Sequence, residues 1–196
     1  GVGGDKSDSA NVTINIADAL VAPVAVDDHI YTNISGAFTV KDSWLLKNDT
    51  DADTAHASLI ISSVAAASGQ ATFFDGGTPS HAGTDVSVNL DIGGGANAIG
   101  DGETTSFDYV VKDPVLQDTG NAQVTYDVTG PINGSSGADI LIGLDVGLNG
   151  GAGDDQIAGT GTKDLLDFSN VSSNWSLTLG AGGSGTATID GTDSYE

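Results

Sequence analysis

Residues 150–158 read GGAGDDQIA, and they match at every defined position a nine-residue pattern, G-G-x-G-x-D-x-U-x, in which U is a large aliphatic residue. The glycines allow a tight turn that other residues resist. The aspartate at the sixth position, Asp155, is placed to face a cation together with the carbonyl groups of the turn, and Ile157 at the eighth points into a core. The stretch therefore predicts one turn of a stack of short parallel strands.

Three further copies of the pattern flank this stretch, and one of them is shortened. They are residues 134–142 (GSSGADILI), the shortened 143–149 (GLDVGLN) and residues 159–167 (GTGTKDLLD). Their aspartates are Asp139, Asp145 and Asp164, in chain order. A disordered linker rich in Gly and Asp is the alternative, but it has no reason to hold aliphatic residues in frame with the aspartates.

Successive turns of such a stack alternate between its two edges, so a cation lies between every second turn. We therefore expect the copies at 134–142 and 150–158 to form the principal site, with carboxylates from Asp139 and Asp155. A hard cation takes roughly six to eight oxygens, and the carbonyl ligands that we expect to complete this shell are those of Gly134, Ser136, Gly151 and Gly153.

At the opposite edge of the stack, Asp145 is expected to face residues 160–164. Thr162 replaces the glycine at the fourth position of this copy. We therefore expect this second site, which includes Asp164, to be weak or empty.

These copies resemble the calcium-binding repeats of the RTX (hemolysin-type, repeats-in-toxin) family of secreted bacterial proteins over residues 134–168. The segment LDFSN at 166–170 also resembles the usual exit from such a block. The resemblance implies a calcium-binding parallel β-roll. Residues 174–179 and 186–189 are then expected to form a hairpin that closes the roll, with Trp175 as its cap.

Acidic residues dominate the composition: 27 Asp and Glu stand against 5 Lys and Arg, for a net charge of −22. Such a chain repels itself and is compacted by divalent cations, whereas nucleic acid needs a basic face. A halophile-type solvated surface is the alternative.

There is no cysteine, so no disulfide can stabilise the fold, and bound metal ions are the remaining means of doing so. We find no apolar run long enough for membrane insertion and no signal peptide.

The chain before residue 131 predicts short strands at regular spacing, with turn residues between them. A strand around Ile30 is followed by residues 37–40, 59–64, 70–74, 85–91, 106–111 and 122–128. Nothing between them is long enough for a crossover helix, and residues 43–47, SWLLK, are compatible with one helical turn. We therefore predict an all-β chain: an immunoglobulin-like, antiparallel sandwich followed by the β-roll.

A short internal similarity suggests how the chain is divided. Residues 10–13, ANVT, resemble residues 122–125, AQVT. We expect residues 1–22 to be the tail of a preceding repeat and a linker, residues 23–130 the sandwich, and residues 131–196 the β-roll with its terminal hairpin.

The sandwich resembles the cadherin-like tandem repeats of large bacterial surface proteins. The segments that carry the resemblance are AVDD at 25–28, WLLKNDTDAD at 44–53 and FDYVVKD at 107–113.

Carboxylates at alternate positions of a tight loop can converge on one calcium ion, and such a loop holds Asp49, Asp51 and Asp53. It departs from the helix-loop-helix calcium motif, which needs a glycine and a bidentate glutamate where Thr54 and Ile60 stand. Cadherin-like domains hold their ions at the junction between modules, so the resemblance adds Asp27 or Asp28, and Asp113. The alternative is an ordinary solvated acidic loop.

The sequence lacks the patterns typical of enzymes, such as a nucleophile elbow, a phosphate-binding loop or zinc-type histidine spacing, and we expect a non-enzyme. We predict a calcium-dependent structural and adhesive segment of a secreted or cell-surface bacterial adhesin, which contacts neighbouring repeats of its own chain. One alternative is a calcium-dependent polysaccharide-binding module of a biofilm matrix protein. Exposed rings at Tyr31, Phe73 or Phe74 would support this alternative. Another is the C-terminal export and folding block of a secreted hydrolase.

Overall fold

A computed structural model describes residue 4, residues 20–93 and 98–168, and three short segments at 176–179, 185–188 and 192–195. The chain is all-β, with one short α-helix and two turns of 3-10 helix among these residues. The elements of the first part are β1 (Asp28–Thr32), β2 (Ala37–Lys41), α1 (Asp42–Leu45), η1 (His56–Ser58), β3 (Ile60–Ala66), η2 (Ala71–Phe73), β4 (Ser80–Ala82), β5 (Asp85–Asn89), β6 (Thr104–Lys112) and β7 (Gln117–Tyr126). Those of the second part are β8 (Ile132–Asn133), β9 (Ile140–Gly143), β10 (Gly147–Asn149), β11 (Gln156–Gly159), β12 (Leu165–Leu166), β13 (Ser176–Leu179), β14 (Gly185–Thr188) and β15 (Thr192–Tyr195).

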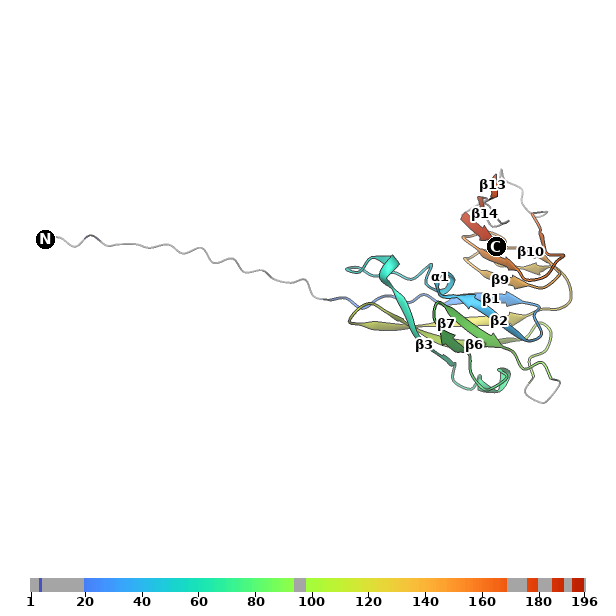
Figure 1. The fold of residues 1–196 in the computed structure, drawn as a ribbon, viewed down its shortest axis with the longest axis horizontal. Coiled ribbons are helices and arrows are strands. Elements are labelled where there is room, and N and C mark those ends of the chain that lie inside the picture. Colours follow the sequence, from blue (N-terminus) through green and yellow to red (C-terminus); the bar gives the residue numbers. More distant parts are fainter. Residues whose placement is uncertain are drawn as a thin grey trace.

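Two sheets face each other in the first part and form a sandwich (Figure 1). One contains β1, β7, β6 and β3 in that order, and the other contains β2, β5 and β4. Alternating residues point inward, as in β6, where every second side chain is buried. Phe107, Tyr109 and Val124 from the first sheet meet Val40 and Val86 from the second in one hydrophobic core.

Three details of the sandwich differ from the prediction. The sheet is mixed, because β1 runs parallel to β7 with Asp28 opposite Ala122, whereas a fully antiparallel sandwich was expected. The strand predicted at 70–74 is wrong: the chain turns at Gly69 (φ 79°) and forms η2, and only Phe74 makes a bridge, to Leu90. The strand β4 was missed because its three residues carry little apolar pattern.

The C-terminal stack, residues 131–166, contains two sets of parallel strands that alternate along the chain. β8, β10 and β12 form one parallel sheet, while β9 and β11 pair with each other in the other sheet. Between them lies a second core of Ile132, Leu141, Leu148 and Ile157. The aliphatic residues that the repeat pattern selected at 141 and 157 therefore point inward.

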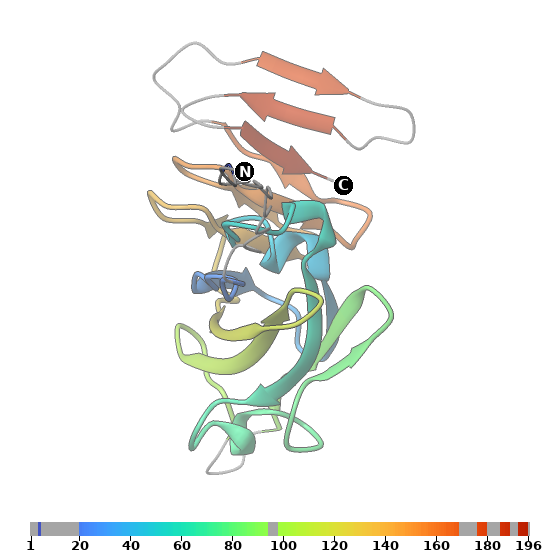
Figure 2. The same cartoon turned by 90° about the vertical axis from the view of Figure 1, so that its left-hand side faces the viewer.

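The stack and the sandwich share one sheet, which has nine strands (Figure 2). β1 pairs with β7 on one side and, again in parallel, with β9 on the other. Ile140 and Ile142 of β9 belong to the sandwich core, whereas Leu141 between them faces the second core. The predicted boundary at residue 130 thus divides the chain but not the sheet.

The three C-terminal strands extend the same sheet beyond the stack. β13 and β14 pair antiparallel, which agrees with the predicted hairpin, and β15 pairs with β14 and in parallel with β11. The predicted cap, Trp175, lies outside the described residues, and so do residues 1–19 of the tail predicted at 1–22, apart from Gly4. Among the described residues, no helix has the length and apolar character needed to cross a membrane.

Candidate metal centre

Three aspartate side chains converge at the end of the sandwich where residue 20 lies. Asp51 and Asp53 come from the loop after α1, and Asp113 directly follows β6. One carboxylate oxygen of each lies within 4.8 Å of the others. Within residues 20–93 and 98–168, this is the one group of three or more acidic or histidine side chains with such spacing. Three of the five ligands predicted for the junction site are therefore brought together.

Local hydrogen bonds fix the carboxylates of this acidic cluster, Asp51, Asp53 and Asp113. Asp51 Oδ1 accepts hydrogen bonds from the backbone N–H groups of Asp53 and Thr54, each at 2.9 Å. Asp113 Oδ1 accepts the N–H of Val115 at 2.5 Å and also that of Leu116. A bridge between Val24 and Thr50 ties the loop to the segment that enters the sandwich.

The electrostatics of the acidic cluster suit a hard cation. The backbone N–H of Asp53 and, after it, that of Thr54 lower the pKa of Asp51, so its carboxylate stays ionised. Asp51 Oδ2 is shielded from solvent and has no hydrogen-bond donor among the described residues. Three negative groups this close repel one another, and oxygen ligands of this kind are the ones that calcium takes.

The other two predicted junction ligands, Asp49 and Asp28, lie outside the acidic cluster and are buried. Asp49 is 1% exposed, and its Oδ1 accepts the N–H of Val26 at 2.7 Å. Burial raises the pKa of Asp49 to about 6, and its Oδ2 has no donor among the described residues. The Asp49 carboxylate is therefore held by Val26, in the segment that precedes β1, and not by its loop neighbours.

Asp28, at the start of β1, belongs to a buried polar network. Its Oδ2 lies 2.7 Å from the Tyr109 hydroxyl, which also lies 2.8 Å from the Val26 carbonyl, and its Oδ1 accepts Asn48 Nδ2 at 3.2 Å. Burial raises the pKa of Asp28 to about 8. A protonated Asp28 can donate to the Tyr109 oxygen while Tyr109 donates to Val26, so the neutral carboxyl satisfies the network. Asp28 ends the segment AVDD and Tyr109 lies in FDYVVKD, but the sequence analysis did not predict that the two side chains meet.

In the C-terminal stack, the turn at 134–139 lies directly against the turn at 150–155, as the repeat pattern predicted. The N–H of Asp139 donates to Asp155 Oδ1 at 2.9 Å, and the N–H of Ala152 donates to the Ser135 carbonyl at 3.2 Å. Asp139 and Asp155 are both buried, at 2% and 0% exposure. Asp139 Oδ2 accepts the N–H of Ser135 at 2.5 Å and its hydroxyl at 2.9 Å.

Glycines make this close stacking possible. Gly151 and Gly153 adopt φ angles of 91° and 123°, and a Cβ at Gly151 would lie 2.1 Å from the Ser135 carbonyl oxygen. The two predicted carboxylates, Asp139 and Asp155, thus lie in adjoining turns. The expected carbonyl ligands, Gly134, Ser136, Gly151 and Gly153, belong to the same two turns and stay a prediction.

The opposite edge of the stack also shows the predicted pairing. Asp145 Oδ1 accepts the N–H groups of Thr162 and Lys163 at 2.8 and 3.0 Å. Asp164 accepts the N–H groups of Val146 at 3.1 Å and Gly161 at 2.7 Å. Backbone donors therefore already occupy these carboxylates, and the expectation of a weak or empty second site stays a prediction.

The aromatic rings that would mark a polysaccharide site do not form an exposed patch. Phe74 is 3% exposed and Phe73 packs against the sandwich core. Tyr31 packs against the second core, and its ring lies 4.3 Å from that of His29. Two histidines are tied to neighbouring side chains: His29 is half-buried and bonds to Thr125, and His81 bonds to Asp42.

No family model and no curated protein matches the chain. A solved structure of three immunoglobulin domains of titin, carrying an E-to-A mutation, is similar over 91% of this chain, with 11% sequence identity and a TM-score of 0.23. The similarity covers 66% of that titin chain, which is less than two thirds of its length. A score this low does not establish a shared fold.

Proposed function

We propose that the chain is a calcium-dependent structural segment of a secreted or cell-surface bacterial adhesin, with a cadherin-like sandwich followed by an RTX β-roll. The observation that carries the proposal is the acidic cluster at the end of the sandwich. Three carboxylates approach within 4.8 Å of one another in a chain of net charge −22. A divalent cation removes this repulsion, and the shielded Asp51 Oδ2 offers it a ligand.

The stacked turns at 134–139 and 150–155 supply the second argument. They hold the buried Asp139 and Asp155 in adjoining turns, at the positions where the RTX-like pattern puts its acidic ligands. Calcium takes carboxylate and carbonyl oxygens as ligands, and in the proposal the residues of the two turns supply them. Because these sites form only in the folded chain, binding adds directly to folding stability.

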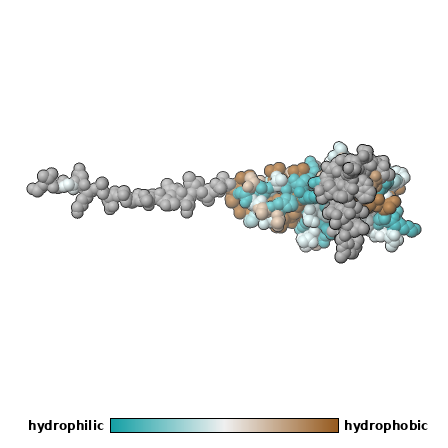
Figure 3. Space-filling view, turned by 90° about the horizontal axis from the view of Figure 1, so that it is seen from above, coloured by the Kyte–Doolittle hydropathy of each residue, from teal (hydrophilic) through white to brown (hydrophobic). Residues whose placement is uncertain are grey.

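The surroundings of the acidic cluster suit contact with a neighbouring repeat. Apolar side chains lie beside hydrophilic surface at this end of the sandwich (Figure 3). They include Leu20, Val21, Val24 and Val115, which are 44–59% exposed. In the proposal, cation binding fixes the loop and the entering segment, so that a preceding module of the same chain is held at a defined angle. Outside the cell, millimolar calcium fills sites with dissociation constants of about 10⁻⁴ to 10⁻³ M.

Calcium titration with magnesium as control tests the proposal. Calorimetry and circular dichroism are recorded on the calcium-free chain, on Asp51→Asn with Asp53→Asn, on Asp139→Asn with Asp155→Asn, and on Asp75→Asn. Asp75 is exposed, bonds to Asn89 and belongs to neither group, so it controls for lost charge.

We expect each double variant to lose one class of calcium sites and Asp75→Asn to bind as the parent does. Binding of magnesium as tight as that of calcium, or no calcium binding up to about 10 mM, well beyond weak extracellular sites, contradicts the proposal.

A further inference from the structure

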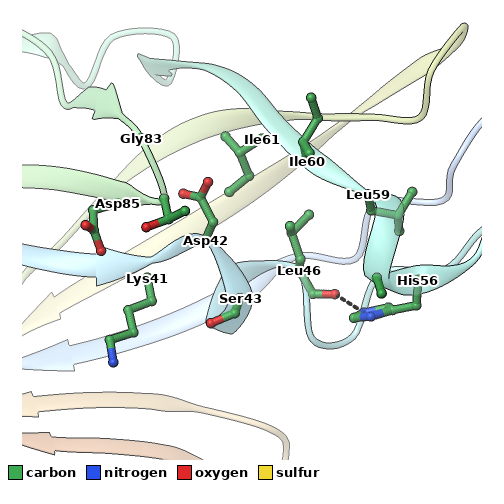
Figure 4. A pocket seen from close by; sticks show the side chains of 12 residues that line it. Lys41, Asp42, Ser43, Leu46, His56, Leu59, Ile60, Ile61, Gly83 and Asp85 are labelled. Carbon is green, nitrogen blue, oxygen red and sulfur yellow. Dashed lines mark hydrogen bonds between the residues drawn. The ribbon is translucent and has the colours of Figure 1, made fainter.

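A cavity of about 780 Å³ opens between the two sheets of the sandwich, and none of the proposed calcium ligands lines it. It lies where α1 and the start of β3 face the turn between β4 and β5 (Figure 4). The binding hypothesis drawn from the sequence does not account for it. Cavities of this size are typical of sites that bind small molecules.

The wall of the cavity is aliphatic. Leu46, Leu59 and Ile61 form its inner side and are 3–7% exposed, and Ile60 at its mouth is 54% exposed. No Phe, Tyr or Trp lines the cavity, and its one ring is the imidazole of His56. The interior therefore favours an unbranched hydrocarbon chain over a sugar ring, because sugars are commonly held by stacking on aromatic faces.

Two carboxylates stand at one end of this aliphatic wall. Asp42, at the start of α1, extends toward Ile61, and Asp85 comes from the neighbouring β5 (Figure 4). Asp42 Oδ2 lies 2.9 Å from His81 Nε2, whereas Asp42 Oδ1 is shielded and has no hydrogen-bond donor among the described residues. The terminal torsion of a carboxylate is broad, so a small rotation turns Oδ1 toward a donor in the cavity while His81 stays in contact.

Besides His81 at Asp42 Oδ2, two basic side chains, Lys41 and His56, line the cavity. Lys41 stands opposite Asp85 in the pairing of β2 with β5. The Lys41 ammonium lies 5.5 Å from the centroid of the Trp44 ring and points away from Asp42 (Figure 4). His56 Nε2 lies 2.7 Å from the Leu46 carbonyl oxygen. A buried carboxylate oxygen without a donor is unfavourable, and a cationic N–H donor is the partner that offsets this most strongly.

We propose that this cavity binds an alkylammonium group, with the ammonium at Asp42 and Asp85 and the hydrocarbon chain along Leu46, Leu59 and Ile61. Free aliphatic amines and lysine side chains share this chemistry. A divalent metal ion is disfavoured, because the group of three metal-type ligands found in the described residues lies elsewhere. Anionic ligands are opposed by the two carboxylates and by the net charge of −22.

Chemical-shift perturbation of backbone amides tests the proposal with three probes. These are n-pentylamine, 1-pentanol as its uncharged counterpart, and the peptide acetyl-Gly-Lys-Gly-amide. We expect pentylamine to bind with a dissociation constant of about 1 mM, as a small ligand does, and to shift residues 42–46, 59–61 and 83–85. Asp42→Asn and Asp85→Asn should each weaken binding about tenfold, while Asp75→Asn, with the same loss of charge, should leave it unchanged.

Three results would overturn the proposal: pentanol binding as tightly as pentylamine, shifts scattered over the acidic surface, or unchanged binding by both Asp42→Asn and Asp85→Asn. Pentylamine binding with no response to the peptide identifies a free amine as the ligand, and binding of both identifies lysine side chains as ligands too. The titration is run in calcium and in EDTA. The cavity contains none of the proposed calcium ligands, so failure of the calcium proposal leaves this result intact.

Discussion

Replacing Asp28 by Asn tests whether a buried carboxyl group lowers the free energy of unfolding of the calcium-free chain as the pH rises. Asp28 is 8% exposed and lies against Tyr109 and Asn48, and its pKa rises from 3.8 to about 8 because burial disfavours the charged form. In the unfolded chain the carboxyl ionises near 3.8. The folded protein therefore holds a proton that the unfolded chain releases between these two values.

The magnitude follows from this difference in proton binding. The contribution of the neutral carboxyl to the free energy of unfolding is fully present below pH 4, since both states are then protonated. It falls by about 1.4 kcal/mol for each pH unit and is lost above pH 8. Over the whole interval, from 3.8 to about 8, the loss is roughly 6 kcal/mol, a large part of the stability of a domain.

Urea unfolding in EDTA, at pH values from 4 to 8.5, measures the effect. We expect stability of the parent to fall over this range and Asp28→Asn to flatten the profile, so that the variant is the more stable of the two above pH 8. Asp108→Asn is the matched control, because Asp108 is only half-buried on β6 and bonds to Asn121. Parallel profiles for the parent and Asp28→Asn would refute the assignment of a proton to Asp28.

Three further changes test the packing around these sites. Tyr109→Phe removes the hydroxyl that lies 2.7 Å from Asp28, and we expect a loss of about 1–3 kcal/mol in urea unfolding. Gly151→Ala forces a Cβ to 2.1 Å from the Ser135 oxygen, so amides of the C-terminal stack should exchange with deuterium faster, whereas Gly137→Ala, whose nearest neighbour lies at 3.7 Å, should not have this effect. Ile142→Ala, at 1% exposure, should lower the free energy of unfolding by about 2–5 kcal/mol, while the exposed Ile60 should tolerate alanine.

Local patterns in the sequence were sufficient for most strands and for the pairing of the turns. Alternation located β6 and β7, and the repeat frame placed Leu141 and Ile157 in the second core and the turn of Asp139 against that of Asp155. These features depend on neighbouring residues and on a fixed period, which a sequence displays directly.

Pairings between distant segments could not be obtained in this way. Nothing in DHIYT marks β1 as the partner of both β7 and β9. The uninterrupted apolar run at Ile140, Leu141 and Ile142 was a signal of a strand buried on both faces, but only its middle residue was used. The separation of Asp28 and Asp49 from the acidic cluster has the same origin, because Tyr109 and Val26, the partners that hold them, are remote in sequence.

The double pairing of β1 links the two halves of the molecule energetically. Ile30 of β1 is fully buried in the sandwich core, while Tyr31 packs against the second core. Unfolding of the stack would remove β9, one of the two strands that pair with β1, and leave an exposed strand edge, which is prone to pair with other chains. Hydrogen bonds of Asn33 with Leu144, at 2.8 and 3.0 Å, reinforce the connection. A cation that stabilises the stacked turns would therefore also protect the sandwich, so calcium bound at 134–155 should slow amide exchange in β1 as well as in β9.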